Sequence, residues 1–410
     1  MRIVLENCRI IDGKGEEIPS GHVIVEGKRI ETVSRGPVDG KTERDRIINL
    51  AGRTVLPGLI DCHVHLGWYG NPMQSVILGS DSTEILRMAQ NAYRTLLAGV
   101  TTVRDMGAQN CLNIHLRDAV NSGVTLGSRI CASGTLVCMT GGHGWHIGFE
   151  ADGRAEVRKA VRKQLKAGAD VVKLIATGGV LTLGVQPGDP QFTYEELLAG
   201  AEEAHKAGRK VASHVQGTEG LHNALKAGID TIEHGVFIDD EAITMFLKSG
   251  AFLIPTLCAP HHILKNGVEK GIPPEIIEKA ERIAAVHIAS AEKAYRAGVT
   301  LAMGTDAGTP FNMHGENLKE LELLRAIGMT PGELISAATS TAARVLGMEK
   351  EIGSLEAGKL ADLIVVDEDP LQDICVLQNK DKIPVIMKDG QFYKMALNGT
   401  KATKLQEATV

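Results

Sequence analysis

The sequence predicts an α/β fold: a (βα)8 TIM barrel with a small β-sandwich domain built from both chain ends. Three observations support this prediction. Short apolar runs alternate with segments of helical period, a small residue followed by Gly recurs between them, and hairpin-like runs are confined to the two ends. Strands that alternate with helices form parallel βα units, and eight such units can close into a barrel.

Eight runs are expected to form the barrel strands. In chain order they are TVLPGLIDCHVHL, VTTVRDMG, RICASGTLV, DVVKLIATG, KVASHVQG, DTIEHGVF, AFLIPTL and TLAMGTDAG. All but the first are preceded by a small residue and Gly, at Gly99, Gly123, Gly168, Gly208, Gly228, Gly250 and Gly298. Gly is the residue expected just past a helix end. A doubly wound open sheet is the alternative, and the lack of a dinucleotide-binding glycine fingerprint after the first strand weighs against it.

The two ends of the chain predict β-hairpins. HVIVEGKRIETV carries an EG turn, and IPVIMKDGQFYKM carries a DG turn. Neither end is expected to bury a core alone, so the simplest arrangement pairs them. We therefore expect a composite β-sandwich domain of residues 1–54 and 353–398 beside a barrel domain of residues 55–352.

Bulk composition narrows the class of protein. The 410 residues carry a net charge of −6, so no basic face for nucleic acid is expected. The N-terminus has early acids and no long apolar core, and no long uncharged apolar run follows, so neither a signal peptide nor a membrane partner is expected. The 7 cysteines include no CxxC pair. A disulfide framework is therefore not expected, and the cytoplasm is the expected compartment.

Polar side chains that suit a metal site recur in or at the ends of the predicted strands. They are His63 and His65 in LIDCHVHL, Lys173 in VVKLIA, His214 in KVASHV, His234 in DTIEHG and Asp306 in TLAMGTD. His63 and His65 lie two residues apart, so both imidazoles point to the same side of a strand. Neutral imidazoles and carboxylates are ligands for zinc-like ions. If the strands line one barrel, these side chains converge at one mouth as a metal-dependent hydrolytic site.

Lys173 has two interpretations, because a free ammonium is costly to bury within an apolar run. It either pairs with an acid such as Asp306, or its amine captures carbon dioxide and becomes a carbamate. The carbamate is favoured, since an anion that bridges two cations explains a lysine among four histidines.

Three long connections follow the ends of predicted strands. They run from Gly67 to Thr83, from Gly178 to Thr193 and from Cys258 to Pro274, and they are expected to cover the site. His261 and His262 in the third are expected to be solvated, and His287 is expected to play no part. Arg104 and Asp105 are expected to form a structural pair beneath the site.

The ligand pattern resembles the amidohydrolase superfamily over nearly the whole chain. The resemblance rests on His63-Val64-His65, Lys173, His214, His234 and Asp306. TTVRDMG, TGGHG, KLIATGGV, IEHG and GTDAG resemble the branch of prolidase-like and Xaa-Arg/Lys carboxypeptidase-like dipeptidases. The terminal segments GSLEAGKLADLIVVDEDP and IPVIMKDG are similar to the family's returning β-segment, and imidazolonepropionases share this resemblance.

The resemblance implies a pair of divalent ions, usually Zn2+. His63, His65 and Asp306 would bind one ion and His214 and His234 the other, with N6-carboxylated Lys173 and a hydroxide bridging them. Asp306 would act as general base and then general acid. His143 in TGGHG would hydrogen-bond the substrate carbonyl and its oxyanion, the alternative being a loop histidine on solvent.

Substrate preference does not carry over from the resemblance. Proline-selective relatives have His-Ala-Tyr at the fifth strand and basic-selective relatives have His-Ala-His, whereas this chain has His214-Val215-Gln216. Gln216 is expected to face the substrate. The expected function is hydrolysis of an amide bond in a small-molecule substrate, a dipeptide or an N-acyl amino acid, by a homo-oligomer. The alternatives are a cyclic amide hydrolase of the imidazolonepropionase type, which lacks the lysine and uses one metal, and an inactive scaffold.

Overall fold

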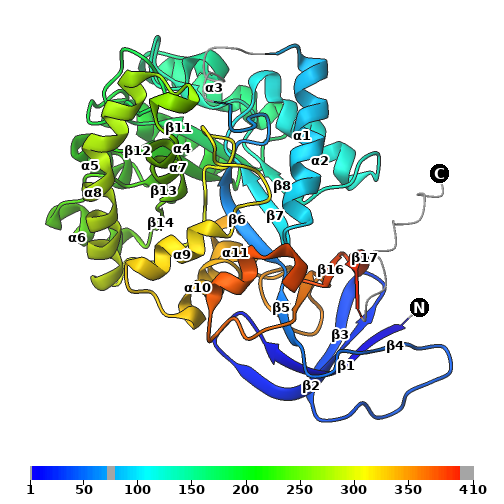
Figure 1. Ribbon diagram of the computed structural model, residues 1–410. Helices are drawn as coiled ribbons and strands as arrows, with labels where there is room; N and C mark the ends of the chain where they lie inside the picture. The colour runs from blue at the N-terminus through cyan, green and yellow to red at the C-terminus, as the bar shows by residue number, and fades with distance from the viewer. Residues whose placement is uncertain (1, 72–78, 398–410) are drawn as a thin grey trace.

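The computed structural model describes residues 2–71 and 79–397 of the chain. Strands from both chain ends gather at one end of the molecule, and parallel strands surrounded by helices make up the rest (Figure 1). Among the described residues, no helix is long and apolar enough to cross a membrane.

The terminal sheet combines strands from both ends of the chain. Its members are β1 (Arg2–Ile11), β2 (Glu17–Glu26), β3 (Arg29–Arg35), β4 (Arg46–Asn49), β5 (Thr54–Pro57), β15 (Leu363–Val366), β16 (Val385–Lys388) and β17 (Gln391–Met395). The order is β17-β16-β15-β5-β1-β2-β3, with β4 beside β1. Both predicted hairpins are confirmed, since Glu26 pairs with Arg29 and Lys388 pairs with Gln391. The sheet has its own apolar core, which takes residues from both ends of the chain.

The central strands are all parallel to their neighbours. They are β6 (Leu59–Val64), β7 (Val100–Asp105), β8 (Arg129–Ala132), β9 (Val137–Cys138), β10 (Phe149–Glu150), β11 (Val171–Ile175), β12 (Lys210–Val215), β13 (Thr231–His234) and β14 (Phe252–Ile254). They form one sheet of order β6-β7-β8 and another of order β10-β9-β11-β12-β13-β14. The predicted eighth strand has no regular ladder, but Leu301 bridges to Leu253 of β14, and Ala307 bridges to Val64 of β6.

Helices connect the central strands, as an α/β fold requires. The α-helices are α1 (Asp81–Leu96), α2 (Leu112–Asn121), α3 (Gly153–Ala167), α4 (Tyr194–Lys206), α5 (Thr218–Lys226), α6 (Asp240–Ser249), α7 (Cys258–Asn266), α8 (Pro274–Arg296), α9 (Lys319–Ala326), α10 (Pro331–Ala337) and α11 (Ser340–Leu346). Short 3-10 helices are η1 (Gln109–Cys111), η2 (Trp145–Ile147), η3 (Val268–Lys270), η4 (Ile374–Gln378) and η5 (Lys380–Lys382). Each Gly predicted to end a helix has a positive φ, which confirms that part of the pattern.

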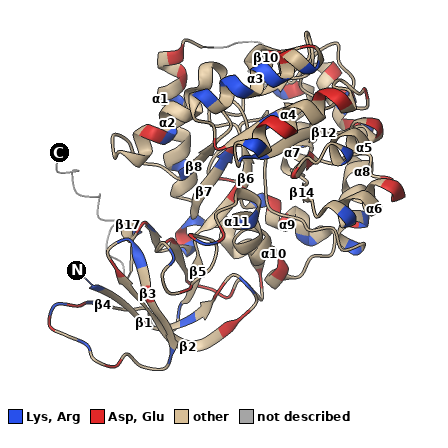
Figure 2. Ribbon diagram, turned by 180° about the vertical axis from the view of Figure 1, so that it is seen from behind, with Lys and Arg blue, Asp and Glu red and all other residues tan. Residues whose placement is uncertain are grey.

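The helical faces on the outside carry charges of both signs. Figure 2 shows Lys and Arg beside Asp and Glu on α3 and α4. Arg158 and Arg162 of α3 pair with Glu202 and Glu203 of α4. These pairs hold two neighbouring helices together at the surface, where each contributes about 1 kcal/mol or less.

The first predicted strand is in fact two strands that belong to different sheets. β5 lies in the terminal sheet and β6 begins the parallel strands, with Gly58 between them. A Cβ atom at Gly58 would lie 2.2 Å from Thr101 Oγ1, so only glycine permits this close approach to the neighbouring strand. The prediction of one continuous strand was wrong because this close approach lies between segments far apart in the sequence.

The three long connections have different structures. The segment from Cys258 to Pro274 was predicted to be a loop, but it contains α7 and η3. The start of α7 is held by buried Glu320, whose carboxylate accepts hydrogen bonds from the backbone N–H groups of Leu257 and Cys258. The first connection lies partly outside the described residues, at 72–78. The second, from Gly178 to Thr193, holds no regular helix or strand and lies over the site described next.

Candidate metal centre and active site

One buried cavity lies at the carboxyl ends of the parallel strands, and the structure brings the predicted site residues together there. His63, His65, His143, Lys173, His214, Gln216, His234 and Asp306 all line this cavity. Residues from β6, β11, β12 and β13 reach it because parallel strands present their carboxyl ends on the same side. Apolar side chains form most of the remaining wall, among them Trp68, Leu136, Ile175 and Ile283.

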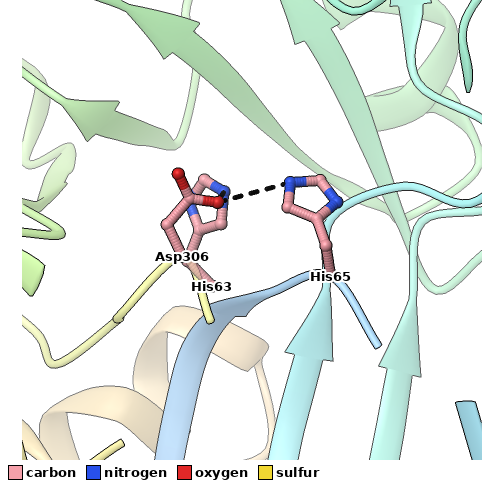
Figure 3. A group of neighbouring side chains, drawn as sticks. All are labelled: His63, His65 and Asp306. Carbon is pink, nitrogen blue, oxygen red and sulfur yellow. Dashed lines mark ion pairs between the residues drawn. The ribbon is translucent and has the colours of Figure 1, made fainter. Parts of the chain in front are cut away.

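His63, His65 and Asp306 form the tightest group in the cavity. One ligand atom from each lies within 4.8 Å of the others. The Nε2 atoms of His63 and His65 are each 3.5 Å from Oδ1 of Asp306. Figure 3 shows the two imidazoles and the carboxylate pointing toward one another, the imidazoles from the end of β6 and the carboxylate from the predicted eighth strand. Two imidazole nitrogens and a carboxylate oxygen that converge in this way can hold a divalent ion.

Hydrogen bonds fix which nitrogen of His63 and of His65 faces the cavity. His65 Nδ1 lies 3.1 Å from the carbonyl oxygen of Gly107, and His63 Nδ1 lies 2.7 Å from Glu233 Oε2. A carbonyl and a carboxylate only accept hydrogen bonds, so both Nδ1 atoms carry the hydrogen. Burial lowers the pKa of His65 to about 3 and that of His63 well below its usual value, which keeps both rings neutral. Each Nε2 therefore presents a lone pair to the cavity.

His214 and His234 offer their lone pairs through different nitrogens. Their ring centroids are 4.4 Å apart. Thr256 Oγ1 donates to the carbonyl of Pro255, so it accepts from His234 Nδ1, 2.6 Å away, and leaves Nε2 free. His214 Nε2 lies 3.1 Å from the carbonyl oxygen of Gly178, which leaves Nδ1 free. Burial lowers the pKa of both rings, which favours the neutral form that can bind a metal ion.

Lys173 is buried between these two groups without a partner. The residue is only 2% exposed, and its Nζ atom makes no hydrogen bond. Burial lowers the pKa of the Lys173 amine, and a charge there would lower the pKa values of His63, His65, His214 and His234. An ammonium with three unsatisfied donors beside neutral imidazoles is a costly arrangement. Burial therefore makes the neutral amine easier to reach than in a free lysine, and the missing hydrogen bonds favour a modified side chain.

The backbone at two of these residues is held in a rare conformation. Asp306 has a φ of 56° and His234 a φ of 71°, which is uncommon for residues with a Cβ. The carbonyl of Asp306 accepts hydrogen bonds from Asn312 Nδ2 and Thr309 Oγ1, at 3.0 and 2.8 Å. The carbonyl of His234 lies 3.0 Å from His287 Nε2, which donates to it. These hydrogen bonds stabilise the strained backbone conformation, in which both side chains point into the cavity.

Three buried charged residues support the site. Glu233 Oε1 accepts from Arg104 Nη2 at 2.8 Å while Oε2 binds His63, and Arg104 Nε donates to the carbonyl of Cys62. Asp61 accepts from the backbone N–H groups of His63 and Thr305 and so ties β6 to the segment that carries Asp306. Sequence reasoning missed both carboxylates. The available signal was an acid and a base placed inside apolar runs, where each needs a partner.

Some expectations about individual side chains were wrong. Arg104 was expected to pair with Asp105, but adjacent strand residues point to opposite faces, and Arg104 pairs with Glu233. His262 was expected to be solvated but is 8% exposed on α7, whereas His261 is partly exposed. His287 was expected to play no part, yet it lines the cavity and supports His234. Helix α7 and the packing of α8 bring these residues inside.

Replacing Glu233 with glutamine is expected to weaken both folding and metal binding. The change leaves buried Arg104 without its counter-ion, which costs about 3–5 kcal/mol. It also replaces the anion that fixes the His63 tautomer, which lowers metal affinity about 10- to 100-fold. Urea unfolding and a zinc titration measure the two effects. Glu203→Gln is the matched control, since Glu203 pairs with arginines on α3 far from the cavity, and it should leave zinc affinity unchanged. Unchanged zinc affinity in Glu233→Gln would contradict the orienting role.

A group of two imidazoles and a carboxylate at the carboxyl ends of parallel strands is typical of one class of enzyme, the hydrolases that work with bound divalent ions. A family model described as the amidohydrolase family matches residues 54–393. The chain therefore belongs to the amidohydrolase family, whose members generally use divalent metal ions, and the His63, His65 and Asp306 group is a candidate site for one.

Several named proteins are similar to this chain. Ochratoxinase of Aspergillus niger is 31% identical over an alignment that covers 94% of this chain and 85% of the relative. The solved structure of a Xaa-Pro dipeptidase with bound methionine in the active site is 36% identical with a TM-score of 0.90, covering 96% of this chain and 100% of that one. Imidazolonepropionase of Symbiobacterium thermophilum is 23% identical and covers 88% of this chain and 85% of its own length. The chain is accordingly an enzyme, a hydrolase that acts on carbon–nitrogen bonds of the amide type.

Proposed function

We propose that this protein is a binuclear metal-dependent amidohydrolase that cleaves the amide bond of a dipeptide or an N-acyl amino acid. The observation that carries the proposal is Lys173, a buried amine without a partner between two groups of neutral ligands. His63, His65 and Asp306 would hold one ion, and His214 and His234 the other. Two ions, usually Zn2+, would supply a water nucleophile at neutral pH and polarise the scissile carbonyl.

The carbamate at Lys173 fits the chemistry of this position. A neutral amine adds carbon dioxide and releases one proton, which leaves an N6-carboxylate with two oxygen ligands. Burial lowers the pKa of the amine and so favours the neutral, nucleophilic form. The product is an anion that would satisfy cations on both sides, whereas the ammonium has no hydrogen-bond partner. The orphaned Nζ atom therefore supports a carboxylated lysine as the bridging ligand.

Asp306 and His143 would carry the proton transfer and the contact with the carbonyl. Burial raises the pKa of Asp306, and nearby Lys173 opposes that rise, so the carboxyl group is suited to take a proton and give it back. Asp306 would receive the proton of the attacking water and deliver it to the departing amine. Burial lowers the pKa of His143 to about 3, so its ring is neutral and offers one N–H donor to the carbonyl oxygen.

The walls of the cavity favour a substrate with an apolar side chain. Besides the proposed ligands, the lining is dominated by aliphatic residues and Trp68, and no arginine contributes to it among the described residues. Gln216 Oε1 is buried and has no partner, so it can accept a hydrogen bond from a substrate N–H. An apolar amino acid whose amide N–H binds Gln216 fits these features.

The architecture of the site supports the barrel that the sequence predicts. We infer that the central strands close into a (βα)8 barrel, because the segment after Gly298 joins β14 to β6. The predicted start of the barrel at residue 55 moves to Gly58, since β5 lies in the terminal sheet. Ala302 N donates to Leu253 O at 3.1 Å and Cys62 N donates to Met303 O at 2.9 Å. Residues 2–57 and 353–397 would form the composite β-sandwich domain, supported by their shared sheet and core. Residues 1 and 398 of the predicted domain lie outside the described residues.

A cyclic amide hydrolase of the imidazolonepropionase type is the second candidate. It is favoured by a specific observation: in the part of the chain that the structure describes, only His63, His65 and Asp306 form a cluster of three metal-ligand side chains from His, Cys, Asp and Glu. Such an enzyme would need one ion and would leave Lys173 without a role.

Metal content and substrate preference test the proposal together. The Zn2+-loaded protein is analysed for metal by mass spectrometry and screened against dipeptides, N-acyl amino acids and cyclic amides. We expect two ions per chain and fastest hydrolysis of linear amides of apolar amino acids. One ion per chain with ring opening of a cyclic amide would support the second candidate. No bound metal and no hydrolysis would indicate an inactive scaffold and contradict the proposal.

A further inference from the structure

We propose that Lys279 on α8 is a positioning residue that holds His143 in place through the connection from Gly178 to Thr193. The inference rests on the proposed role of His143 as the donor to the substrate carbonyl. Lys279 is 2% exposed and does not line the cavity, so it reaches the reaction only through other residues.

Hydrogen bonds link α8 to the connection from Gly178 to Thr193. Lys279 Nζ donates to the carbonyl oxygen of Thr182 at 2.8 Å and to Glu275 Oε1 at 2.6 Å. The same Glu275 oxygen accepts from the backbone N–H of Gly184 at 3.0 Å. A buried ammonium bonded to a carbonyl and a carboxylate is a strong, geometrically defined anchor. One turn of α8 thus holds the middle of the connection on both sides of Leu183.

The connection in turn contacts the histidine. Thr182 Oγ1, on the anchored residue, accepts from the backbone N–H of Gly144 at 3.0 Å. Gln191 Oε1 accepts from the backbone N–H of His143 at 2.9 Å. A Cβ atom at Gly179 would lie 2.5 Å from the His143 ring, so this stretch of the connection packs directly on the imidazole. The connection therefore contacts His143 at its backbone, at its following residue and at its ring.

The sequence around His143 explains why such support is needed. His143 lies in TGGHG, and Gly141 and Gly144 have φ angles of 69° and 76°, so the segment has few side chains to restrain it. His143 Nδ1 is buried without a partner. No hydrogen bond fixes Nδ1, so packing on the ring and restraint of the backbone decide where the ring points. A donor to a developing oxyanion acts only if it is already in position.

Steady-state kinetics of Lys279→Met on the Zn2+-loaded enzyme tests the inference. Loss of the anchor should lower kcat about 10- to 100-fold, because a misplaced carbonyl contact acts in the transition state, while KM changes less than about twofold. Lys293→Met is the matched control: Lys293 lies on the same helix and also binds a backbone carbonyl and a carboxylate, at Ile238 and Asp240. It should keep the kcat of the unmodified enzyme. An unchanged kcat in Lys279→Met overturns the inference.

A second pair of variants avoids the cost of removing a buried charge. Thr182→Val has nearly the same shape but cannot accept from Gly144 N–H, whereas Thr182→Ser keeps the oxygen. We expect kcat to fall about tenfold in the valine variant and to recover in the serine variant, with bound metal unchanged in both. Equal kcat values for valine and serine would contradict the link through Thr182.

Combining Lys279→Met with His143→Ala separates the proposed role of Lys279 from the proposed role of His143. If Lys279 acts through His143, Lys279→Met should add little to the loss already caused by His143→Ala. Multiplicative losses in the double variant overturn the inference while the role of His143 stands. An unchanged kcat in His143→Ala alone overturns the proposed role of His143 and this inference with it.

Discussion

Replacing Lys173 with alanine is expected to remove at least one metal ion and nearly all hydrolysis, a loss on the order of a thousandfold or more in kcat/KM. The reason is that alanine deletes the proposed bridging anion and leaves neutral imidazoles and the single carboxylate of Asp306 to face two cations that repel each other. The metal content of the purified variant and its kcat/KM measure the effect.

The carbamate itself has a direct signature. Protein prepared with 13C-labelled bicarbonate should show a carbamate carbon by NMR, and Lys173→Ala should lack it. Lys388→Ala is the control, because Lys388 is also a buried strand lysine but lies in the terminal sheet beside Asp389. It should keep the carbamate signal, both ions and full activity. Added short-chain carboxylic acids should restore part of the activity of Lys173→Ala. Two bound ions and full turnover in Lys173→Ala would contradict the proposal.

Replacing Asp306 with asparagine is expected to abolish most turnover while substantial metal stays bound. The change keeps the size of the side chain and an oxygen near His63 and His65, but it removes the group that takes and returns a proton. General acid–base catalysis contributes about 10²- to 10⁴-fold, so kcat should fall by that range. Metal analysis and kcat on the same preparation separate loss of the ion from loss of the proton carrier.

The leaving group sharpens the test of Asp306. An alkyl amide needs a proton on the departing amine, whereas a nitrophenyl ester has a leaving group that departs without one. The loss in Asp306→Asn should therefore be clearly smaller for the ester than for the amide. An equal loss for both substrates would assign Asp306 to metal binding alone, and a normal kcat would remove it from the mechanism.

Much of the site could be predicted because the signals are local. The two-residue repeat of a strand puts His63 and His65 on one side. His214 and His234 close apolar runs and so lie at strand ends, whereas Lys173 lies in the middle of its strand. The hairpins at the chain ends were predictable for the same reason, since a two-residue turn fixes the pairing of its neighbours.

The support of the site could not be predicted, because it depends on contacts between distant segments. Arg104 and Glu233 are 129 residues apart, and they meet only when β7 and β13 face each other across the interior. The connection that begins with α7 gave no clear helical signal, because part of what holds the start of that helix is Glu320, on another helix. Neither contact can be predicted from the residue pattern of a single segment.

The sequence by itself determined the chemical inventory: alternating strands and helices, with imidazoles, an amine and a carboxylate placed at strand ends by short-range periodicity. The tertiary structure alone decided how that inventory is oriented. It selects Nε2 of His63, His65 and His234 but Nδ1 of His214, leaves Lys173 without a partner, and anchors His143 through Lys279. The physical reason is that tautomers, desolvation and restraint are set by the atoms that surround a side chain, and the folded chain draws those atoms from many distant positions.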